Sequence, residues 1–218
     1  MNLLWYDENG IDVEDSVGID EAGRGPLAGP VVAASVWISS PLFATLKNSD
    51  LIIRDSKKMT ARQRKKVLDW IKLQSDETIR YSIASATVEE IDEINILQAA
   101  LLAMKRSYYS LKFPVKRLLV DGNKAPRIKD VDVRTIVKGD DKVLSISLAS
   151  IIAKEYRDNL MRKLALEYPH YGWETNVGYG SKKHMESILQ QGITPHHRKT
   201  FAPINTFLSK KIIKNNYS

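Results

Sequence analysis

Short runs of apolar, mostly β-branched residues alternate along this chain with longer segments in which apolar residues recur every three or four positions. The first pattern is typical of strands, and the second is typical of helices that bury one face. The runs predict strands over 16–20, 30–38, 78–86, 115–123 and 131–141. The longer segments predict helices over 60–74, 87–111, 145–169 and 181–192.

The ends of these predicted helices carry start and stop signals. Thr60 is a candidate N-cap, and Thr87 with Glu90 has the spacing of a capping box. Pro169 and Gly192 stand where the third and fourth of these helices should end, and both residue types stop helices. The helix boundaries can therefore be predicted from local chemistry.

The order of the elements indicates the fold class. About ten residues separate the first two strands, which is too short for a helical crossover, so we expect these strands to pair antiparallel. Strands and helices alternate afterwards, which indicates an α/β fold: a mixed sheet flanked by helices, with a small helical C-terminal extension. We expect an N-terminal segment over 1–16, a main domain over 17–170, and a helical extension with a basic tail over 171–218.

The composition suits a folded, soluble protein of a reducing compartment. With 218 residues, of which 43% are hydrophobic, the chain can bury a sizeable core. It has no cysteine, which excludes disulfides and thiolate metal sites, and its four histidines form no His-Glu-x-x-His pattern. The acidic N-terminus is unlike a signal peptide, and no apolar stretch approaches the roughly 20 residues of a membrane span. We therefore expect a cytoplasmic monomer with no membrane partner.

The formal net charge is +7, and basic residues gather toward the C-terminus. From Ser181 to the end, Glu186 is the single acid. The basic residues of this region include Lys182, Lys183, Arg198, Lys199, Lys210, Lys211 and Lys214. A basic region with interleaved aromatic residues is typical of proteins that bind phosphate backbones, although a solvated lysine-rich surface has the same charge. Nucleic acid is therefore a candidate partner.

The glycine-rich stretch Gly23–Ala28 formally matches the relaxed dinucleotide-binding fingerprint. That motif requires a helix to begin on the loop, whereas here the β-branched segment 30–38 continues into a strand. Asp20 and Glu21 would also repel the incoming phosphates. No Gly-Lys-Ser/Thr follows at the spacing of a P-loop. The loop therefore fits neither a dinucleotide-binding motif nor a P-loop, unless a cation lies between its acids and the phosphates.

Acidic residues follow three of the predicted strands. Asp20 and Glu21 end the first, Asp121 follows "RLLV", and Asp140 with Asp141 follows "TIVKG". Strand ends of α/β sheets gather at one edge, and clustered carboxylates repel one another unless a divalent cation lies among them. Oxygen ligands favour magnesium or manganese (Mg2+ or Mn2+), and acids around two such ions are an arrangement that hydrolyses phosphodiesters. For any single acid, a role in a turn or a helix cap is the alternative.

Eight sequence blocks between Val17 and Pro203 together resemble the bacterial ribonuclease HII family, the type 2 ribonucleases H. The blocks, in the order of the family, are GIDEAGRGPLAGPVVAA, DSKK, EEIDEINILQAALLAMKR, LLVDGN, VKGD, ASIIAKEYRD, GYGSKKH and HHRKTFAP. The resemblance implies a ribonuclease H-like α/β fold and a metal-dependent endonuclease that cleaves the RNA strand of RNA-DNA hybrids, including single ribonucleotides embedded in duplex DNA. It also implies cleavage on the 5′ side of the ribonucleotide, which leaves 3′-hydroxyl and 5′-phosphate ends.

The resemblance assigns the catalytic acids to four positions. They are Asp20 and Glu21 of "DEAGRG", Asp121 of "VDGN" and Asp140 of "VKGD", and all four are implied as ligands of a two-metal site. The residues alone do not separate Asp140 from its neighbour Asp141; the family pattern favours the acid directly after Lys-Gly.

Asp158 of "AKEYRD" is a further acidic candidate near this set. It lies four residues from both Lys154 and Arg162 on a predicted helix, which favours a structural salt bridge.

The resemblance also assigns residues to the substrate. A glycine backbone can approach a ribose closely, and Gly23, Arg24 and Gly25 are implied to contact the 2′-hydroxyl. Tyr179 is implied to pack against the adjacent deoxyribose and to contact the same hydroxyl; without the resemblance it would be a surface turn residue. Predicted phosphate contacts, for which a solvated charged patch is the alternative, are Ser56, Lys57, Lys58, Lys182, Lys183 and Arg198.

The chain departs from the family at one notable position, since Leu148 stands where many members have a small residue. No catalytic acid is missing, which disfavours a non-catalytic nucleic-acid-binding module on the same fold. A type 3-like ribonuclease H that prefers long hybrids is the other alternative, and the short segment before the first strand disfavours it. No protein partner can be predicted.

Overall fold

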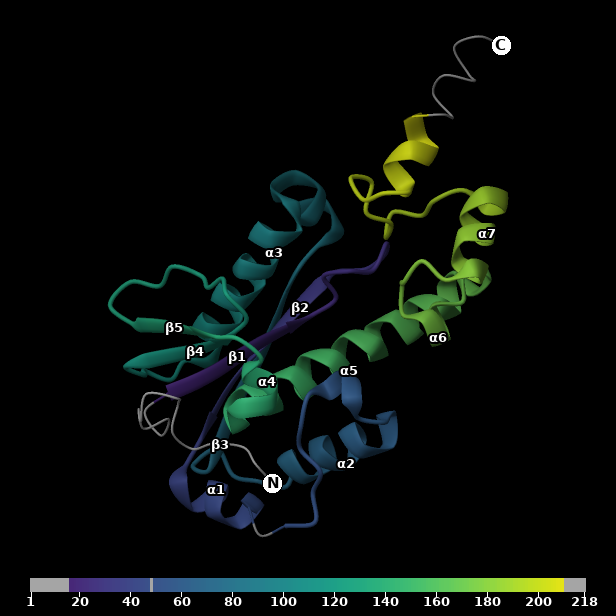
Figure 1. The fold of residues 1–218 in the computed structure, drawn as a ribbon. Coiled ribbons are helices and arrows are strands. Elements are labelled where there is room, and N and C mark those ends of the chain that lie inside the picture. The colour runs from purple at the N-terminus through teal and green to yellow at the C-terminus, as the bar shows by residue number, and fades with distance from the viewer. Residues whose placement is uncertain (1–15, 48, 210–218) are drawn as a thin grey trace, which may run out of the picture.

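The computed structural model describes residues 16–47 and 49–209. Most of the predicted N-terminal segment, together with the tail residues Lys210, Lys211 and Lys214, lies outside these ranges. In the described part, a five-stranded mixed sheet has the order β3-β2-β1-β4-β5 (Figure 1). The strands are β1 Ser16–Ala22, β2 Val31–Ile38, β3 Ile79–Ala86, β4 Arg117–Asp121 and β5 Asp132–Ile136. The predicted strands and the antiparallel pairing of β1 with β2 are confirmed, and β4 pairs parallel with both β1 and β5.

Helices flank both faces of this sheet. They are α1 Ser40–Lys47, α2 Ala61–Ile71, α3 Val88–Leu111, α4 Gly139–Lys142, α5 Leu144–Glu167, α6 Trp173–Asn176 and α7 Lys182–Gln191. Short 3₁₀ turns span Ser56–Lys58 and Pro169–Tyr171, and a last helix begins at residue 204. The four predicted helices are confirmed as α2, α3, α5 and α7. The short helices α1, α4 and α6 were not predicted, because one or two turns hold too few residues for a periodic pattern.

The two threonines that were predicted to cap helices do so in the structure, at the N-termini of α2 and α3. Thr60 and Thr87 each close a capping box with the residue three positions later. Within α3 the chain kinks at Asn95, whose φ is 68°. The side chain of Asn95 accepts hydrogen bonds from Leu97 N at 3.0 Å and Gln98 N at 3.1 Å, so it caps the longer second half. The single predicted helix is therefore two helices joined at a capped kink.

Alternating side chains of β1 reach two different layers. Val17 and Ile19 join the core beneath α3, while Gly18 faces α5 on the opposite side. A Cβ on Gly18 would collide with the backbone of Ser145 and Ile146, so the glycine lets α5 approach the sheet closely. Helices α1 and α2 complete the layer on the α5 side (Figure 1). This alternation determines which acids of β1 face α5.

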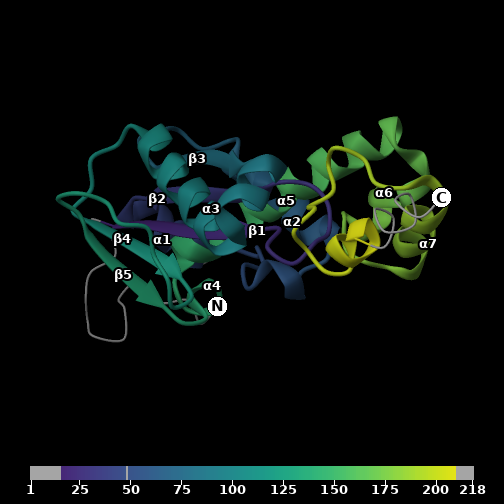
Figure 2. The same ribbon diagram turned by 90° about the horizontal axis from the view of Figure 1, so that it is seen from above.

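The long helix α5 runs from the sheet into the C-terminal extension. Figure 2 shows the extension at the opposite end of the molecule from β4 and β5. It has its own small core around Tyr171 and Trp173, which also buries Met161 of α5 and Leu27 of the β1–β2 loop. The extension is therefore tied to the loop that follows the first acids. The predicted boundary between the main domain and the extension near residue 170 stays a prediction, because this small core contains residues from before and after that boundary. Within the described ranges, no helix is long and apolar enough to cross a membrane.

Candidate active site

The pairing of β1 with β4 brings two predicted acids together. Ile19 pairs with Val120 in parallel register, so Asp20 and Asp121 are the next residues on neighbouring strands. Because successive side chains alternate between the faces of a strand, both carboxylates project toward the α5 side. The structure thus places these two strands side by side, which the sequence suggested but did not establish.

Asp20 is the most deeply buried acid of the site. Only 3% of the residue is exposed, and its Oδ1 accepts a hydrogen bond from Glu21 N at 2.7 Å. Burial raises the pKa of Asp20 well above its usual value, and the charges of Glu21 and Asp121 raise it further, while a hydrogen bond from Ser150 opposes them. Without a cation, this carboxyl group therefore resists ionisation.

Asp140 lies in the same electrostatic environment, but not at a strand end as predicted. It stands in the short helix α4, which begins three residues after β5. The backbone N–H of Gly139 donates to Asp121 Oδ1 at 2.7 Å, which joins this helix to the end of β4. Burial raises the pKa of Asp140 to about 6, with Asp121 and Asp55 as the next causes.

The neighbouring acid Asp141 points away from the cluster. Its carboxylate is bound by the ammonium group of Lys58 and accepts from Asp55 N at 3.3 Å. The hydrogen bond from Lys58 lowers the pKa of Asp141, whereas that of Asp140 is raised. The two adjacent acids, which the sequence did not separate, therefore have different surroundings.

The carboxylates suit an oxygen-ligated cation by chemistry but are not yet arranged around one. In the part of the chain that the structure describes, no three acidic or histidine side chains are already placed as ligands of one metal ion. Asp20 and Asp121 each give an oxygen to a backbone N–H, and Arg24 holds Glu21 through a 3.2 Å ion pair. Mutual repulsion raises the pKa of Asp20, which a divalent cation would relieve.

A pocket of about 570 Å³ is lined by two of these acids, Glu21 and Asp121, while Asp20 and Asp140 are not among its lining residues. It brings together residues from four regions of the sequence that were predicted separately: the acids, the glycine loop, the "DSKK" segment and the tyrosine loop. Its lining includes Glu21, Gly23, Arg24, Gly25, Ser56, Lys57, Asp121, Ser150, Lys154, Arg157 and Tyr179.

The three residues of the "DSKK" segment have different positions. The ammonium group of Lys57 faces the acids, and although burial lowers its pKa, the charges of Asp20 and Asp55 raise it overall. Lys58 is exposed and pairs with Asp141. Ser56 is buried, and its Oγ lies 2.9 Å from Ser150 Oγ. Ser56 also lines the pocket, and because its hydroxyl already shares a hydrogen bond with Ser150, contact with a phosphate at this position stays a prediction.

Close packing explains the glycine at position 23, whereas a side chain at position 25 would make only an ordinary van der Waals contact. Gly23 has a φ of +96°, and a Cβ there would collide with the guanidinium of Arg157. At Gly25, a Cβ would lie 3.4 Å from Cε1 of Tyr179, whose residue is 47% exposed. The tyrosine ring thus packs beside the loop, with one side open to the pocket.

The predicted phosphate contact at Arg198 is wrong, because the residue has no exposed surface. Its guanidinium donates to the carbonyls of Gly23 at 2.5 Å, Arg24 at 2.9 Å and Gly29 at 2.8 Å. Burial lowers the pKa of Arg198 to about 9. Its position in a basic segment gave no sign that it would fold beneath the loop.

Sequence reasoning also missed Arg157, which stands one residue before the candidate Asp158. Arg157 is 1% exposed and donates to the carbonyls of Ala28, Pro30 and Val177 at 2.9 to 3.0 Å. Its place in a helix rich in charged residues did not distinguish it from a surface arginine. The two buried arginines together hold the β1–β2 loop.

The remaining candidates lie outside the cluster of acids. Asp158 is buried and pairs with Lys154 at 2.9 Å, as predicted, but its second partner is Arg64 of α2 at 3.8 Å, while Arg162 bonds Asn159. This acid therefore holds α5 to α2.

Two of the predicted basic contacts stand on α7, at the far side of the tyrosine loop. Lys182 and Lys183 are exposed, and they pair with Glu186 at 3.9 Å and Glu174 at 3.3 Å. Neither lines the pocket over the acids. Contact with a phosphate at these positions stays a prediction.

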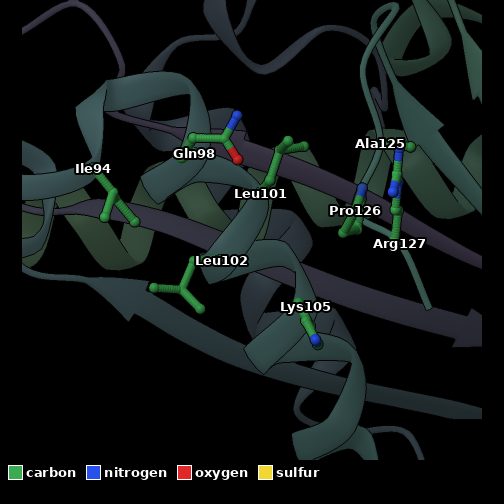
Figure 3. A pocket seen from close by; sticks show the side chains of 8 residues that line it. All are labelled: Ile94, Gln98, Leu101, Leu102, Lys105, Ala125, Pro126 and Arg127. Carbon is green, nitrogen blue, oxygen red and sulfur yellow. The ribbon is translucent and has the colours of Figure 1, made fainter. Parts of the chain in front are cut away.

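A second hollow of about 650 Å³ lies between α3 and the segment that follows β4 (Figure 3). Its walls are mainly apolar, with basic and amide groups at the rim. The lining residues are Ile94, Gln98, Leu101, Leu102, Lys105, Ala125, Pro126 and Arg127. Since no acid lines it, this hollow is not part of the carboxylate site.

A mixed sheet whose adjacent strands end in buried carboxylates, beneath a pocket with basic and glycine-rich walls, is the arrangement of a ribonuclease H-like phosphodiester hydrolase. The chain belongs to the ribonuclease HII family, because the family model described as Ribonuclease HII matches residues 17–204. It is therefore a ribonuclease H endonuclease acting on RNA-DNA hybrids, as its sequence resemblance implies.

Individual relatives agree with this assignment. The chain is 46% identical to the Ribonuclease HII of Pelagibacter ubique, over 88% of this chain and 97% of that protein, and 49% identical to that of Sphingopyxis alaskensis, over 86% and 89%. Among solved structures, ribonuclease H2 from Pyrococcus horikoshii OT3 matches with a TM-score of 0.72 and 28% identity, over 89% of this chain and 97% of that chain. Bst-RNase HIII in complex with Mn2+ matches with a TM-score of 0.68 over 89% and 69%, and at 18% identity it supports the fold alone.

Proposed function

We propose that this ribonuclease H cleaves at single ribonucleotides embedded in duplex DNA as well as in the RNA strand of hybrids. Cleavage falls on the 5′ side of the ribonucleotide and leaves 3′-hydroxyl and 5′-phosphate ends. The observation that carries the proposal is the packing of Tyr179 beside Gly25, within the pocket that Glu21 and Asp121 also line. A sugar bound there would lie between an aromatic ring and a bare stretch of backbone, next to the acids.

The orientation of the loop supports contact with a 2′-hydroxyl. Arg198 binds the carbonyls of Gly23 and Arg24. In a trans peptide the N–H points opposite to the C=O, so the N–H groups of Arg24 and Gly25 point away from the buried guanidinium. A ribose hydroxyl can accept a hydrogen bond from such a donor, whereas a deoxyribose offers no atom at this position.

The reaction depends on Mg2+ or Mn2+, for which the ligands are Asp20, Glu21, Asp121 and Asp140. When bound, the ions supply an activated water and stabilise the leaving oxygen. The protein's own groups prepare the site: burial and mutual repulsion of the carboxylates favour binding of cations. Lys57 adds a positive charge at the edge of the cluster, where a scissile phosphate would lie.

We also propose that the enzyme is a cytoplasmic monomer whose substrate is its principal partner. The absence of cysteine supports a reducing compartment. The exposed lysines Lys58, Lys182 and Lys183 are proposed to contact phosphates of the duplex outside the pocket.

Three duplexes of one sequence test this proposal: DNA with one ribonucleotide, a continuous RNA-DNA hybrid, and DNA alone. Each is incubated with magnesium, with manganese and with a chelator. Cleavage of the first two with either metal, and of none with chelator, is expected. Cleavage of the continuous hybrid alone would favour the type 3-like specificity, and cleavage that persists in chelator would remove the metal from the mechanism.

A further inference from the structure

Two histidines lie buried side by side in the small core of the C-terminal extension. His184 of α7 and His197 have no exposed surface, and their Nε2 atoms are 3.0 Å apart. Trp173 donates its indole N–H to His184 Nε2 at 3.1 Å, and Tyr171 packs edge-on against both imidazoles. These side chains lie behind the catalytic pocket and not among the residues that line it. Any role in the reaction must therefore pass through other residues.

The partners of the two histidines determine which nitrogens carry protons. Indole and backbone N–H groups can only donate. Since Trp173 donates to Nε2 of His184, this histidine carries its proton on Nδ1 and donates to the carbonyl of Tyr179 at 2.8 Å. The N–H of Thr194 donates to Nδ1 of His197 at 2.9 Å, so His197 donates from Nε2 to His184 Nε2, whose single lone pair it shares with the indole N–H of Trp173. Both imidazoles are neutral, and burial lowers the pKa of both, that of His197 to about 3.

This chain of hydrogen bonds ends on the loop that carries Tyr179. The two preceding carbonyls are also held: Val177 O accepts from Arg157 of α5 at 2.9 Å, and Gly178 O accepts from Leu27 N of the β1–β2 loop at 2.8 Å. Three consecutive carbonyls are thus bound by three separate elements. The bond from His184 acts on Tyr179 itself, whose carbonyl also accepts from Ser181 N at 2.8 Å and whose N–H donates to the carbonyl of Asn176 at 2.9 Å.

At its other end, the pair leads to the glycine loop. His197 forms an isolated β-bridge with Ala28, and the next residue, Arg198, holds the carbonyls of Gly23 and Arg24. A displacement of His197 would therefore shift both Tyr179, through His184, and the Gly23–Gly25 loop, through Arg198.

We propose that the buried His184–His197 pair positions Tyr179 against the Gly23–Gly25 loop, so that the two halves of the ribose-reading site keep a fixed spacing. This inference rests on the proposed function, because it requires that Tyr179 and the loop contact the ribose. The ring of Tyr179 is close to the loop, since a Cβ on Gly25 would lie 3.4 Å from its Cε1, and misplacement of a positioning group by about 1 Å can cost two orders of magnitude in rate. The histidines act as positioning residues through their effect on Tyr179.

Substitutions of His184 test the proposal. His184→Asn carries its amide near the place of Nδ1 and can keep the donor to Tyr179, whereas His184→Gln carries its amide near Nε2 and loses that donor. The readout is the ratio of kcat/KM on a duplex with one ribonucleotide to kcat/KM on a continuous hybrid. We expect His184→Gln to lower this ratio about tenfold, the effect of losing one hydrogen bond, and His184→Asn to restore most of it.

A matched control is available on the same helix. Ser187 of α7 is also buried, and its Oγ donates to the carbonyl of His170 at 2.6 Å, away from the tyrosine loop. Ser187→Ala removes one hydrogen bond of α7 without touching Tyr179. It should leave the ratio unchanged even where the melting temperature falls.

A double-mutant cycle separates positioning from general support of the fold. In a Tyr179→Ala background, His184→Gln should not lower the ratio further, because the group on which it acts is gone. An equal fall in both backgrounds would overturn the inference, and so would an unchanged ratio for His184→Gln. If His184→Gln does not fold, His197→Asn takes its place. It removes the donor to His184 together with the packing of the ring against Tyr171 and Trp173, and it should lower the ratio by a smaller factor, so that an unchanged ratio again overturns the inference. If the wild type does not cleave the single-ribonucleotide duplex at all, the proposed function itself fails.

Discussion

Replacing Gly23 by alanine should destabilise the protein more than replacing a glycine of similar φ elsewhere. Gly23 has a φ of +96° and Gly192, at the end of α7, has +84°. A side chain at either position carries backbone strain of roughly 1–3 kcal/mol. The surroundings differ, because nothing lies within 4 Å of a Cβ at Gly192, whereas one at Gly23 would collide with the Arg157 guanidinium.

The additional loss of stability at Gly23 arises because Arg157 would lose a hydrogen bond. To accommodate a methyl group, its Nε has to retreat, and the 3.0 Å hydrogen bond to Pro30 O is lost. A hydrogen bond from a charged group contributes about 1.5–3 kcal/mol, so with the backbone strain Gly23→Ala should cost about 2.5–6 kcal/mol in total. The new Cβ would also lie only 2.9 Å from Pro30 O, which prevents the loop from closing around it.

Urea denaturation at equilibrium measures this difference. Gly23→Ala should lower the free energy of unfolding by about 1.5–3 kcal/mol more than Gly192→Ala, with similar m-values. Cleavage of both ribonucleotide substrates should fall together for Gly23→Ala and stay near wild type for Gly192→Ala. Equal destabilisation of the two variants would refute the role assigned to Arg157.

Three further predictions concern the acids and the tyrosine. Asp20→Asn or Asp121→Asn should lower the cleavage rate roughly a thousandfold or more while leaving duplex binding intact, since each removes a metal ligand but no basic group; substantial cleavage at saturating metal would contradict this. Asp140 has its folded pKa raised to about 6 from 3.8, so the folded state holds a proton that the unfolded state releases, and stability falls as pH rises between these values. In chelator, Asp140→Asn should therefore melt at a higher temperature than wild type at neutral pH, and this difference in melting temperature should shrink toward about pH 4. A difference that stays constant across this pH range would argue against the raised pKa of Asp140 as its cause. Tyr179→Ala should lose about 5- to 150-fold in rate on a single embedded ribonucleotide and much less on a continuous hybrid. Equal losses on both substrates would mean that Tyr179 only supports substrate binding and does not recognise the single ribonucleotide.

Local chemistry predicted much of the fold. Thr60 and Thr87 cap helices because a hydroxyl and a residue three positions later suffice for the cap, wherever the helix packs. Asp20 and Asp121 could be expected to meet, because both follow apolar strands of one sheet. The kink at Asn95 was missed, since the apolar period continues across it.

The interior of the site could not be predicted in the same way. Arg157 and Arg198 are buried because the β1–β2 loop offers them carbonyl groups, and those acceptors come from residues more than a hundred positions away in the sequence. Composition placed Arg198 in a basic region and so suggested a surface role. The bonding of His184 to His197 likewise depends on how α7 packs in the extension. Long-range backbone acceptors leave no periodic signal in a sequence.

The nature of the cleaved ends tests the central claim most directly, namely hydrolysis by water at a carboxylate-bound metal site. A DNA duplex with one ribonucleotide is digested to completion with magnesium or manganese, and both products are weighed by mass spectrometry. The account predicts a 3′-hydroxyl on the upstream DNA and a 5′-phosphate on the ribonucleotide. A 2′,3′-cyclic phosphate on the ribonucleotide, which forms when the 2′-hydroxyl itself attacks, would contradict it.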